Sequence, residues 1–488
     1  MKHTFRLAAL LLGLLPAAAQ AQGPVRRHLI YFQDKNNSPY SVSQPQAFLS
    51  ARALARRAKQ GIALKPRDLP VNPAYVAQVR AVPGAPEVRY TSRWLNAAVV
   101  ACDSVTLARI YQLPSVKGGQ TLSNTPQPPR PAPAVQPSPA AKAGETPRAT
   151  YGKAYAQAET IGAVAMHAAG YRGEGMQIAV FDAGFPGADQ LGPLQLMQQQ
   201  GRVAGTRNFV DGGRQVYQRN SHGTNCLGLI GGELPGTYVG TAPHATFHLC
   251  ITEDVGSETP VEEANWLAAA EYADSVGVDV ISSSLGYNTF DRPAASYTYA
   301  DLNGRTAISS RAALGAARVG MVVVNSAGND GSNAWHYIGV PADADSIITV
   351  GAVDSLRQHA GFSSYGSTAD GRLKPTLSAM GVASAVLSPA GTVVRGNGTS
   401  YACPELAGLV AGFWQANPQL TAQEVIGALC RSASQAQHPD NTLGFGIPNF
   451  EAAYNLLHPN APLGRPSAAP KAGSKAPPRR AGRAKQGS

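Results

Sequence analysis

The stretch Gly396-Asn397-Gly398-Thr399-Ser400-Tyr401-Ala402-Cys403-Pro404-Glu405-Leu406-Ala407-Gly408 joins a glycine-rich turn to an apolar helix and leaves Ser400 at the join. Backbone N–H groups in the first turn of a helix have no partner within the helix, so developing negative charge is favoured there. Glycines beside the serine let a substrate backbone approach closely. Serine and threonine are also preferred helix caps, so a structural role fits this stretch equally well when it is considered alone. A nucleophile at Ser400 would need a base and an oxyanion donor from elsewhere in the chain.

Three further stretches place a polar side chain at the end of an apolar strand or at the start of a helix. Residues 178–184 end in Asp182-Ala183-Gly184, residues 220–228 carry His222 before Gly-Thr, and residues 322–330 carry Asn329 after Ser-Ala-Gly. Each feature alone also fits a cap, a turn or a structural histidine. Together they supply a carboxylate, an imidazole and an amide, the groups that acyl transfer by a serine requires.

Strands alternate with helices from about residue 151 to 458, which is typical of a parallel sheet covered by helices on both faces. The apolar runs predict strands at 176–181, 246–252, 278–283, 319–324 and 346–353, and helices at 261–276 and 307–317. Ligands of such sheets bind beyond the carboxyl ends of the strands. Asp182 and Asn329 both fall at that edge.

These motifs resemble those of the subtilisin-like serine peptidase family. Asp-Ala-Gly, His-Gly-Thr, Ser-Ala-Gly-Asn and Gly-Thr-Ser-x-Ala-x-Pro occur in the family's order of Asp, His and Ser. The resemblance spans about residues 151–458 and includes Gly-Thr-Ala-Pro at 240–243 and the stretch 280–286. It implies an α/β fold, a three-layer domain with a mainly parallel central sheet, at residues 151–459.

The resemblance also implies residue roles. Asp182, His222 and Ser400 would be catalytic, and the Asn329 amide would line an oxyanion hole. Polypeptide substrates would bind along the backbone of two segments, one comprising Ser284, Leu285 and Gly286 and the other Ser326, Ala327 and Gly328. Ala183, Tyr401 and Glu405 depart from the family pattern, although none of them removes a catalytic atom.

Residues 22–120 predict a small α+β domain ahead of the main one. A strand is expected at 29–32, a single strand or a hairpin with its bend at 95–96 is expected over 88–103, and helices are expected at 47–60, 73–82 and 105–113. A Pro/Ala-rich linker is expected at 121–150. The size and charge of this front domain resemble the propeptide of subtilisin-like enzymes. The resemblance implies that residues 22–120 assist folding and act as an intramolecular inhibitor until the chain is cut within 121–155.

The net charge of +11 conceals three different parts. Residues 22–150 hold 17 Lys/Arg and 5 Asp/Glu, residues 151–459 hold 15 and 25, and residues 460–488 hold 7 and none. Opposite charges on the front and main domains favour their association. The basic balance therefore does not indicate a nucleic-acid partner.

Residues 1–21 have the basic start, apolar run and Ala-Gln-Ala site of a secretory signal peptide. No other stretch predicts a transmembrane segment. We expect a secreted or extracytoplasmic monomer. The basic tail at 460–488 is expected to be disordered; it is a solvated extension, an anchor to acidic cell-surface polymers, or a segment removed in maturation.

Five cysteines show no metal-ligand spacing, and Cys403 and Cys430 either pair or remain free thiols. No cofactor is expected, and structural calcium is compatible with the composition although no ligand loop is recognisable. The sequence predicts a serine endopeptidase made as an inhibited zymogen. Two alternatives remain open: a peptide ligase or cyclase that uses the same acyl-enzyme, and a non-catalytic peptide-binding protein.

Overall fold

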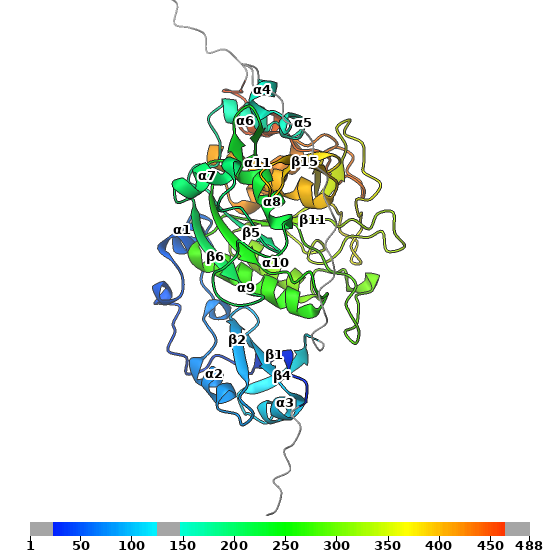
Figure 1. Ribbon diagram of the computed structural model, residues 1–488. Helices are drawn as coiled ribbons and strands as arrows, with labels where there is room; N and C mark the ends of the chain where they lie inside the picture. Colours follow the sequence, from blue (N-terminus) through cyan, green and yellow to red (C-terminus); the bar gives the residue numbers. More distant parts are fainter. Residues whose placement is uncertain (1–22, 124–146, 464–488) are drawn as a thin grey trace, which may run out of the picture.

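The computed structural model describes residues 23–123 and 147–463 (Figure 1). The expected signal segment at 1–21, most of the expected linker, and the tail from residue 464 lie outside the described residues.

The front domain contains a four-stranded antiparallel sheet in the order β2-β3-β1-β4. Of the two alternatives for residues 88–103, the structure has the hairpin, formed by β2 (Glu87–Ser92) and β3 (Ala97–Cys102), and β1 (Arg26–Phe32) pairs with β3. The fourth strand, β4 (Val116–Thr121), was not predicted from the sequence. The helices are α1 (Ala51–Lys59), α2 (Pro73–Arg80) and α3 (Ser104–Ile110), with short 3-10 turns at Pro45–Ala47 and Pro66–Asp68.

The main domain is built on a seven-stranded sheet in the order β13-β12-β11-β10-β5-β9-β6, in which every neighbouring pair is parallel. Its central strands are buried on both faces because helices cover both. The strands are β5 (Gln177–Asp182), β6 (Val203–Asn208), β9 (Thr246–Ile251), β10 (Val280–Ser283), β11 (Val322–Ser326), β12 (Ile348–Val353) and β13 (Leu377–Met380).

Two pairs of helices make the outer layers. On one face α8 (His222–Gly231) and α11 (Thr399–Ala416) pack together, and on the other α9 (Pro260–Val276) packs beside α10 (Ile308–Arg318). A separate core lies on each side of the sheet. This arrangement confirms the α/β fold class.

Smaller elements complete the described part of the main domain. They are α4 (Pro147–Tyr151), α5 (Tyr155–Thr160), α6 (Ala163–Ala168), α7 (Gly192–Gln199), α12 (Ala422–Arg431), α13 (Phe450–Leu457), the turn Tyr299–Asp301, and two small hairpins, β7 (Glu233–Leu234) with β8 (Tyr238–Val239) and β14 (Ser384–Leu387) with β15 (Val393–Gly396).

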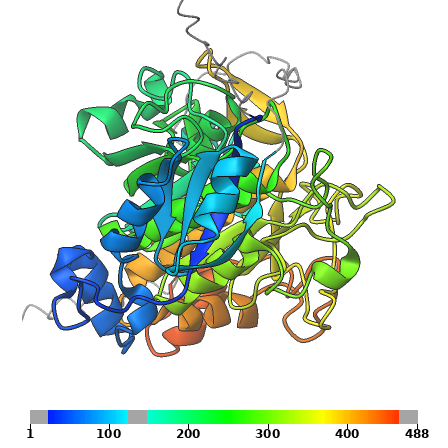
Figure 2. The ribbon, with the colours of Figure 1, turned by 90° about the horizontal axis from the view of Figure 1, so that it is seen from below.

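The front sheet has two buried faces. Alternate residues of β3 separate, so that Ala98 and Val100 face the front domain's own core while Ala97 and Val99 join the core around α9 and α10. Figure 2 looks onto this sheet, in blue and cyan, with the main domain behind it. The front domain therefore rests on the α9–α10 layer.

The structure describes some of the residues that the sequence analysis assigned to the linker (121–150) and to the tail (460–488). Leu122 is buried, the Arg27 N–H donates to the Ser123 hydroxyl (2.8 Å), and α4 begins at Pro147. At the other end the Leu463 N–H donates to the Asn455 side chain (2.7 Å). Within the described ranges, no helix is both long enough and apolar enough to cross a membrane.

Candidate active site

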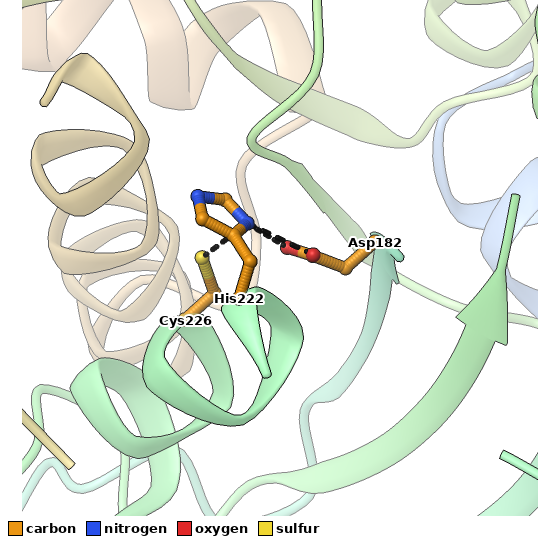
Figure 3. Close-up of side chains that lie close together, drawn as sticks. All are labelled: Asp182, His222 and Cys226. Atoms are coloured by element: carbon orange, nitrogen blue, oxygen red, sulfur yellow. Dashed lines mark hydrogen bonds and ion pairs between the residues drawn. The ribbon is translucent and has the colours of Figure 1, made fainter. Parts of the chain in front are cut away.

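Asp182 and His222 form the most closely joined pair of the predicted site residues. Asp182 is the last residue of β5 and is fully buried, and His222 is the first residue of α8. The His222 Nδ1 lies 2.9 Å and 3.0 Å from the two Asp182 carboxylate oxygens (Figure 3). Gly223 makes this approach possible, because a Cβ there would lie 2.3 Å from the Gly184 carbonyl oxygen and 2.9 Å from the Asp182 Cβ.

The carboxylate is oriented from a second direction and perturbs the imidazole. The Ala183 N–H donates to Asp182 Oδ1 (2.7 Å). Burial is the largest single effect and works against a charged imidazole, but the Asp182 carboxylate and Cys226 together outweigh it and raise the pKa of His222 well above its usual value. The pair is therefore arranged to stabilise an imidazolium.

Ser400 lies in the first turn of α11, as predicted. The Ser284 hydroxyl donates to the Ser400 carbonyl oxygen (2.8 Å), and the Ser400 hydroxyl donates to the Ser284 carbonyl oxygen (3.5 Å). Among the described residues, no hydrogen bond joins the Ser400 hydroxyl to His222. Catalytic hydrogen bonds are often long or unformed until substrate binds.

Cys226 connects the two halves of the site, and sequence reasoning missed it. Its sulfur lies 3.7 Å from His222 Nδ1 and 3.5 Å from the Ser400 carbonyl oxygen. Burial raises the pKa of the Cys226 thiol. The signal for this contact was the position of Cys226 one helical turn after His222, on the same face of α8.

Asn329 lies beside the start of α11. Its side-chain oxygen accepts from the Thr399 N–H (2.9 Å) and from the Thr399 hydroxyl (3.1 Å). This leaves the exposed amide nitrogen as the group able to donate. Thr399 was not singled out from the sequence, although it immediately precedes Ser400.

The six predicted substrate-binding residues divide by exposure. Gly286 is exposed and Gly328 is half-buried, whereas Ser284, Leu285, Ser326 and Ala327 are buried. The Ser284 side chain is occupied by Ser400, and Leu285 belongs to the core around α9 and α10. Contact with a substrate would therefore run mainly through backbone groups near the two glycines.

The departures from the family pattern have different surroundings. Ala183 is buried next to Asp182, and the ring of Tyr401 packs against His222 with centroids 6.0 Å apart. Glu405 is fully buried, and neither of its carboxylate oxygens has a hydrogen-bond partner. Burial raises the pKa of Glu405 well above its usual value.

All five cysteines are buried free thiols, so Cys403 and Cys430 do not pair. Potential metal ligands are limited in the described part of the chain to one group, Asp182, His222 and Cys226, whose ligand atoms lie within 4.8 Å of one another. The Asp182 and His222 atoms of that group already bond to each other.

Comparison with known proteins identifies the same family that the sequence motifs resemble. Residues 173–446 match the model of the Subtilase family, and residues 27–134 match the Peptidase S8 propeptide domain of Bacteroidota. Subtilisin DY of Bacillus licheniformis is 31% identical over 291 residues, covering 59% of this chain and 94% of that protein. Subtilisin NAT of Bacillus subtilis subsp. natto is 33% identical over 300 residues, covering 60% and 69%, and subtilisin of Bacillus pumilus is 33% identical over 298 residues, covering 60% and 96%.

A serine peptidase with a parallel sheet and a front propeptide domain is thus the class that fold and site define. The chain belongs to the subtilase family, and it is a serine endopeptidase.

Proposed function

We propose that the protein hydrolyses peptide bonds through an acyl-enzyme on Ser400, with His222 as general base and Asp182 as its partner. The observation that carries this proposal is the bidentate contact of His222 Nδ1 with the Asp182 carboxylate, beside the first turn of α11. With Nδ1 donating its proton to Asp182, Nε2 would be left to accept a proton.

A serine hydroxyl is a poor nucleophile at neutral pH, so His222 would remove its proton during attack and then pass that proton to the leaving amine. Asp182 would stabilise the imidazolium without becoming protonated. The oxyanion of the tetrahedral intermediate would accept hydrogen bonds from the Asn329 amide nitrogen and the Ser400 N–H. The hydrogen bonds from Thr399 support this role because they hold the Asn329 side chain in place.

We further propose that the protein is a secreted precursor whose front domain inhibits it. The propeptide match supports residues 22–120 as the inhibitor, with residues 121–150 as the linker that is cut and 151–459 as the peptidase domain. The signal features of residues 1–21 support secretion.

The test is labelling with a fluorophosphonate after the connecting segment has been cut and the front domain has been removed. Wild-type protein should take up one label per chain, Ser400→Ala none, and Ser432→Ala, at the end of α12, as much as wild type. Absence of label on folded wild type that has been freed of its front domain would refute the enzyme mechanism, and label on Ser400→Ala would identify a different serine. Mass spectrometry of the products would separate hydrolysis from ligation.

A further inference from the structure

An aspartate on α9 is enclosed by three arginines of the front domain. Asp274 has no exposed surface. Its carboxylate lies 2.5 Å from a guanidinium nitrogen of Arg56, 2.7 Å from one of Arg57 and 2.5 Å from one of Arg93. Arg56 and Arg57 belong to α1, and Arg93 lies between β2 and β3; all three side chains are buried.

The side chains of α1 also hold the ends of two main-domain helices. Arg56 donates to the carbonyl of Val319 (3.2 Å) and to that of Val278. Arg52 donates to the carbonyl of Gly277 (2.9 Å) and pairs with Asp279. The last carbonyls of a helix lack partners within it, so α1 supplies donors at the ends of α9 and α10.

Gln60, directly after α1, extends this contact on both sides. Its amide nitrogen donates to the Gly320 carbonyl (2.8 Å), and its oxygen accepts from the Ala422 N–H (2.9 Å). Gly277 and Gly320 are both packed so closely by α1 or Gln60 that a Cβ on either would lie within 2.7 Å of a front-domain atom. The surface is therefore closely fitted to α1.

This surface lies away from the catalytic groups. Val278 and Asp279 precede β10, and Gly320 precedes β11, so α1 binds at the amino edge of the sheet. Asp182 ends β5, at the carboxyl edge. Six residues of strand separate the two edges, about 20 Å. Figure 1 shows α1, in dark blue, set apart from the front sheet.

Charge makes the fit selective. A buried carboxylate enclosed by guanidinium groups is strongly favoured over one that has lost a partner, because the remaining charge stays desolvated. Arg57 also forms an ion pair within the front domain, 3.4 Å from Asp68, which holds this arginine in position. A front domain without arginines at these positions would leave Asp274 buried and unpaired.

We propose that the Asp274 surface, formed by Asp274, Asp279 and the carbonyls at the ends of α9 and α10, is a recognition site for an arginine-bearing helix, with α1 as its occupant. It selects the cognate front domain and holds it after the connecting segment is cut. This inference rests on the proposed function only in treating the front domain as the inhibitor.

The test uses the full chain carrying Ser400→Ala and a recognition sequence for a site-specific protease placed within residues 124–146. After cutting, the main domain is immobilised on a surface, and the rate at which the front domain dissociates from it is measured. Asp274→Asn should raise this rate about 100-fold or more, as expected for truncating a buried charge pair, and Arg57→Met should raise it about 10-fold. Because the chain is catalytically silent, the result does not depend on whether Ser400 is the nucleophile.

Matched controls are Asp189→Asn and Arg109→Gln, which remove the same charges from exposed positions of the main and front domains; neither should change the rate more than twofold. If Asp274→Asn does not unfold cooperatively, and so is not properly folded, the dissociation rate is measured on Arg52→Gln instead. The Arg52 side chain is 38% exposed and lies at the rim of the Asp274 surface. The proposal would be overturned if those variants of Asp274, Arg57 and Arg52 that fold release the front domain at rates within threefold of the parent chain.

Discussion

His222 experiences two opposing electrostatic effects. Burial disfavours the imidazolium, whereas Asp182, at 2.9 Å, and Cys226 favour it, and together they raise the pKa of His222. The base must be neutral to accept the Ser400 proton, so kcat/KM of the cut enzyme should rise with pH and reach half its maximum above pH 6.5. Asp182→Asn should move that midpoint to lower pH and reduce kcat by about 10⁴, as for the aspartate of other serine-peptidase triads. A pH profile from 5 to 10 checks both, and a wild-type midpoint at or below 6.5 would contradict the electrostatic account.

A substitution at Asn329 should affect transition-state binding and not substrate binding. Asn329→Ala should lower kcat about 10² to 10³-fold and leave KM nearly unchanged, because the oxyanion forms only during the reaction. This magnitude is the one known for the oxyanion-hole asparagine of subtilisin, which belongs to the same family, and it is borrowed from that enzyme. Steady-state kinetics on a peptide amide gives the two parameters. Asn333→Ala, at an exposed turn a few residues on, is the control. A loss confined to KM would contradict the oxyanion role.

Glu405 should make stability depend on pH. Its pKa is raised by burial, so the unfolded chain gives up this proton at lower pH than the folded chain does. Stability is therefore lost as pH rises above the unfolded value of about 4.3. In the Ser400→Ala background, Glu405→Met should add about 1 to 3 kcal/mol at pH 8 and less at pH 4, since both carboxylate oxygens lack partners. Exposed Glu451→Gln is the control, and equal effects at both pH values in urea titrations would contradict this account.

At the scale of elements, α11 carries Ser400 and Thr399, so its position sets the site. Gly408 of α11 packs on Thr241, where an added Cβ would lie 1.9 Å from the Thr241 hydroxyl oxygen and 3.0 Å from backbone. Gly408→Ala should destabilise by about 1 to 3 kcal/mol, and should lower kcat by displacing α11. Gly427→Ala in α12 is the control: its Cβ would approach only the end of Arg431, so helix propensity should make it neutral or stabilising. Equal thermal midpoints for the two variants would contradict the packing argument.

The elements predicted from the sequence have a clear apolar run or period, although α12 and α13 have one as well and were not predicted. Continuous apolar runs form most of β5, at 178–181, and the first part of β11, at 322–324, and the carboxyl ends of these strands had to share one edge of a parallel sheet. β4 and β6 escaped prediction because Val116–Thr121 contains two glycines and Val203–Asn208 is mostly polar or small. Their pairing is determined by partners distant in sequence, β1 and β9.

The residues of the site also divide into those that local sequence patterns predicted and those that only the tertiary structure brings together. Asp182, His222, Asn329 and Ser400 stand in local motifs that could be recognised one at a time. The contacts of Cys226 and of Ser284 with the Ser400 carbonyl depend on how α8, α11 and β10 are placed in space. The Asp274 cluster joins residues more than 170 positions apart, so no local pattern announces it.

At the scale of the whole molecule, part of the opposite charge on the two domains meets in the buried pairs of Asp274 with three arginines. Glu271 on α9 accepts hydrogen bonds from the Arg93 N–H (2.8 Å), the Trp94 N–H (3.1 Å) and the Ser92 hydroxyl (2.5 Å). The charge difference seen in the sequence thus becomes a specific interface between α9 and the turn after β2. Buried pairs are screened less by salt than exposed ones.

We expect this interface to make the front domain dependent on its partner for stability. One face of its sheet, with Leu29, Ala97, Val99 and Leu122, packs on α9 and α10, and the arginines of α1 find their acids there. A domain of this size buries a modest core, and it would expose an apolar face when released. The front domain separated from the cut Ser400→Ala chain should therefore lose most of its far-UV circular dichroism, and should regain it when the remainder of the chain is added back.

The control for this last prediction is the cut but unseparated complex, which should melt cooperatively. Val99→Ser weakens the shared face without touching the front domain's own core, so it should raise the amount of added partner needed for recovery, whereas Val100→Ser should impair the front domain in either state. A separated front domain that keeps its native spectrum and unfolds cooperatively above about 50 °C, as an ordinary autonomous domain does, would show that its fold is independent of α9 and α10.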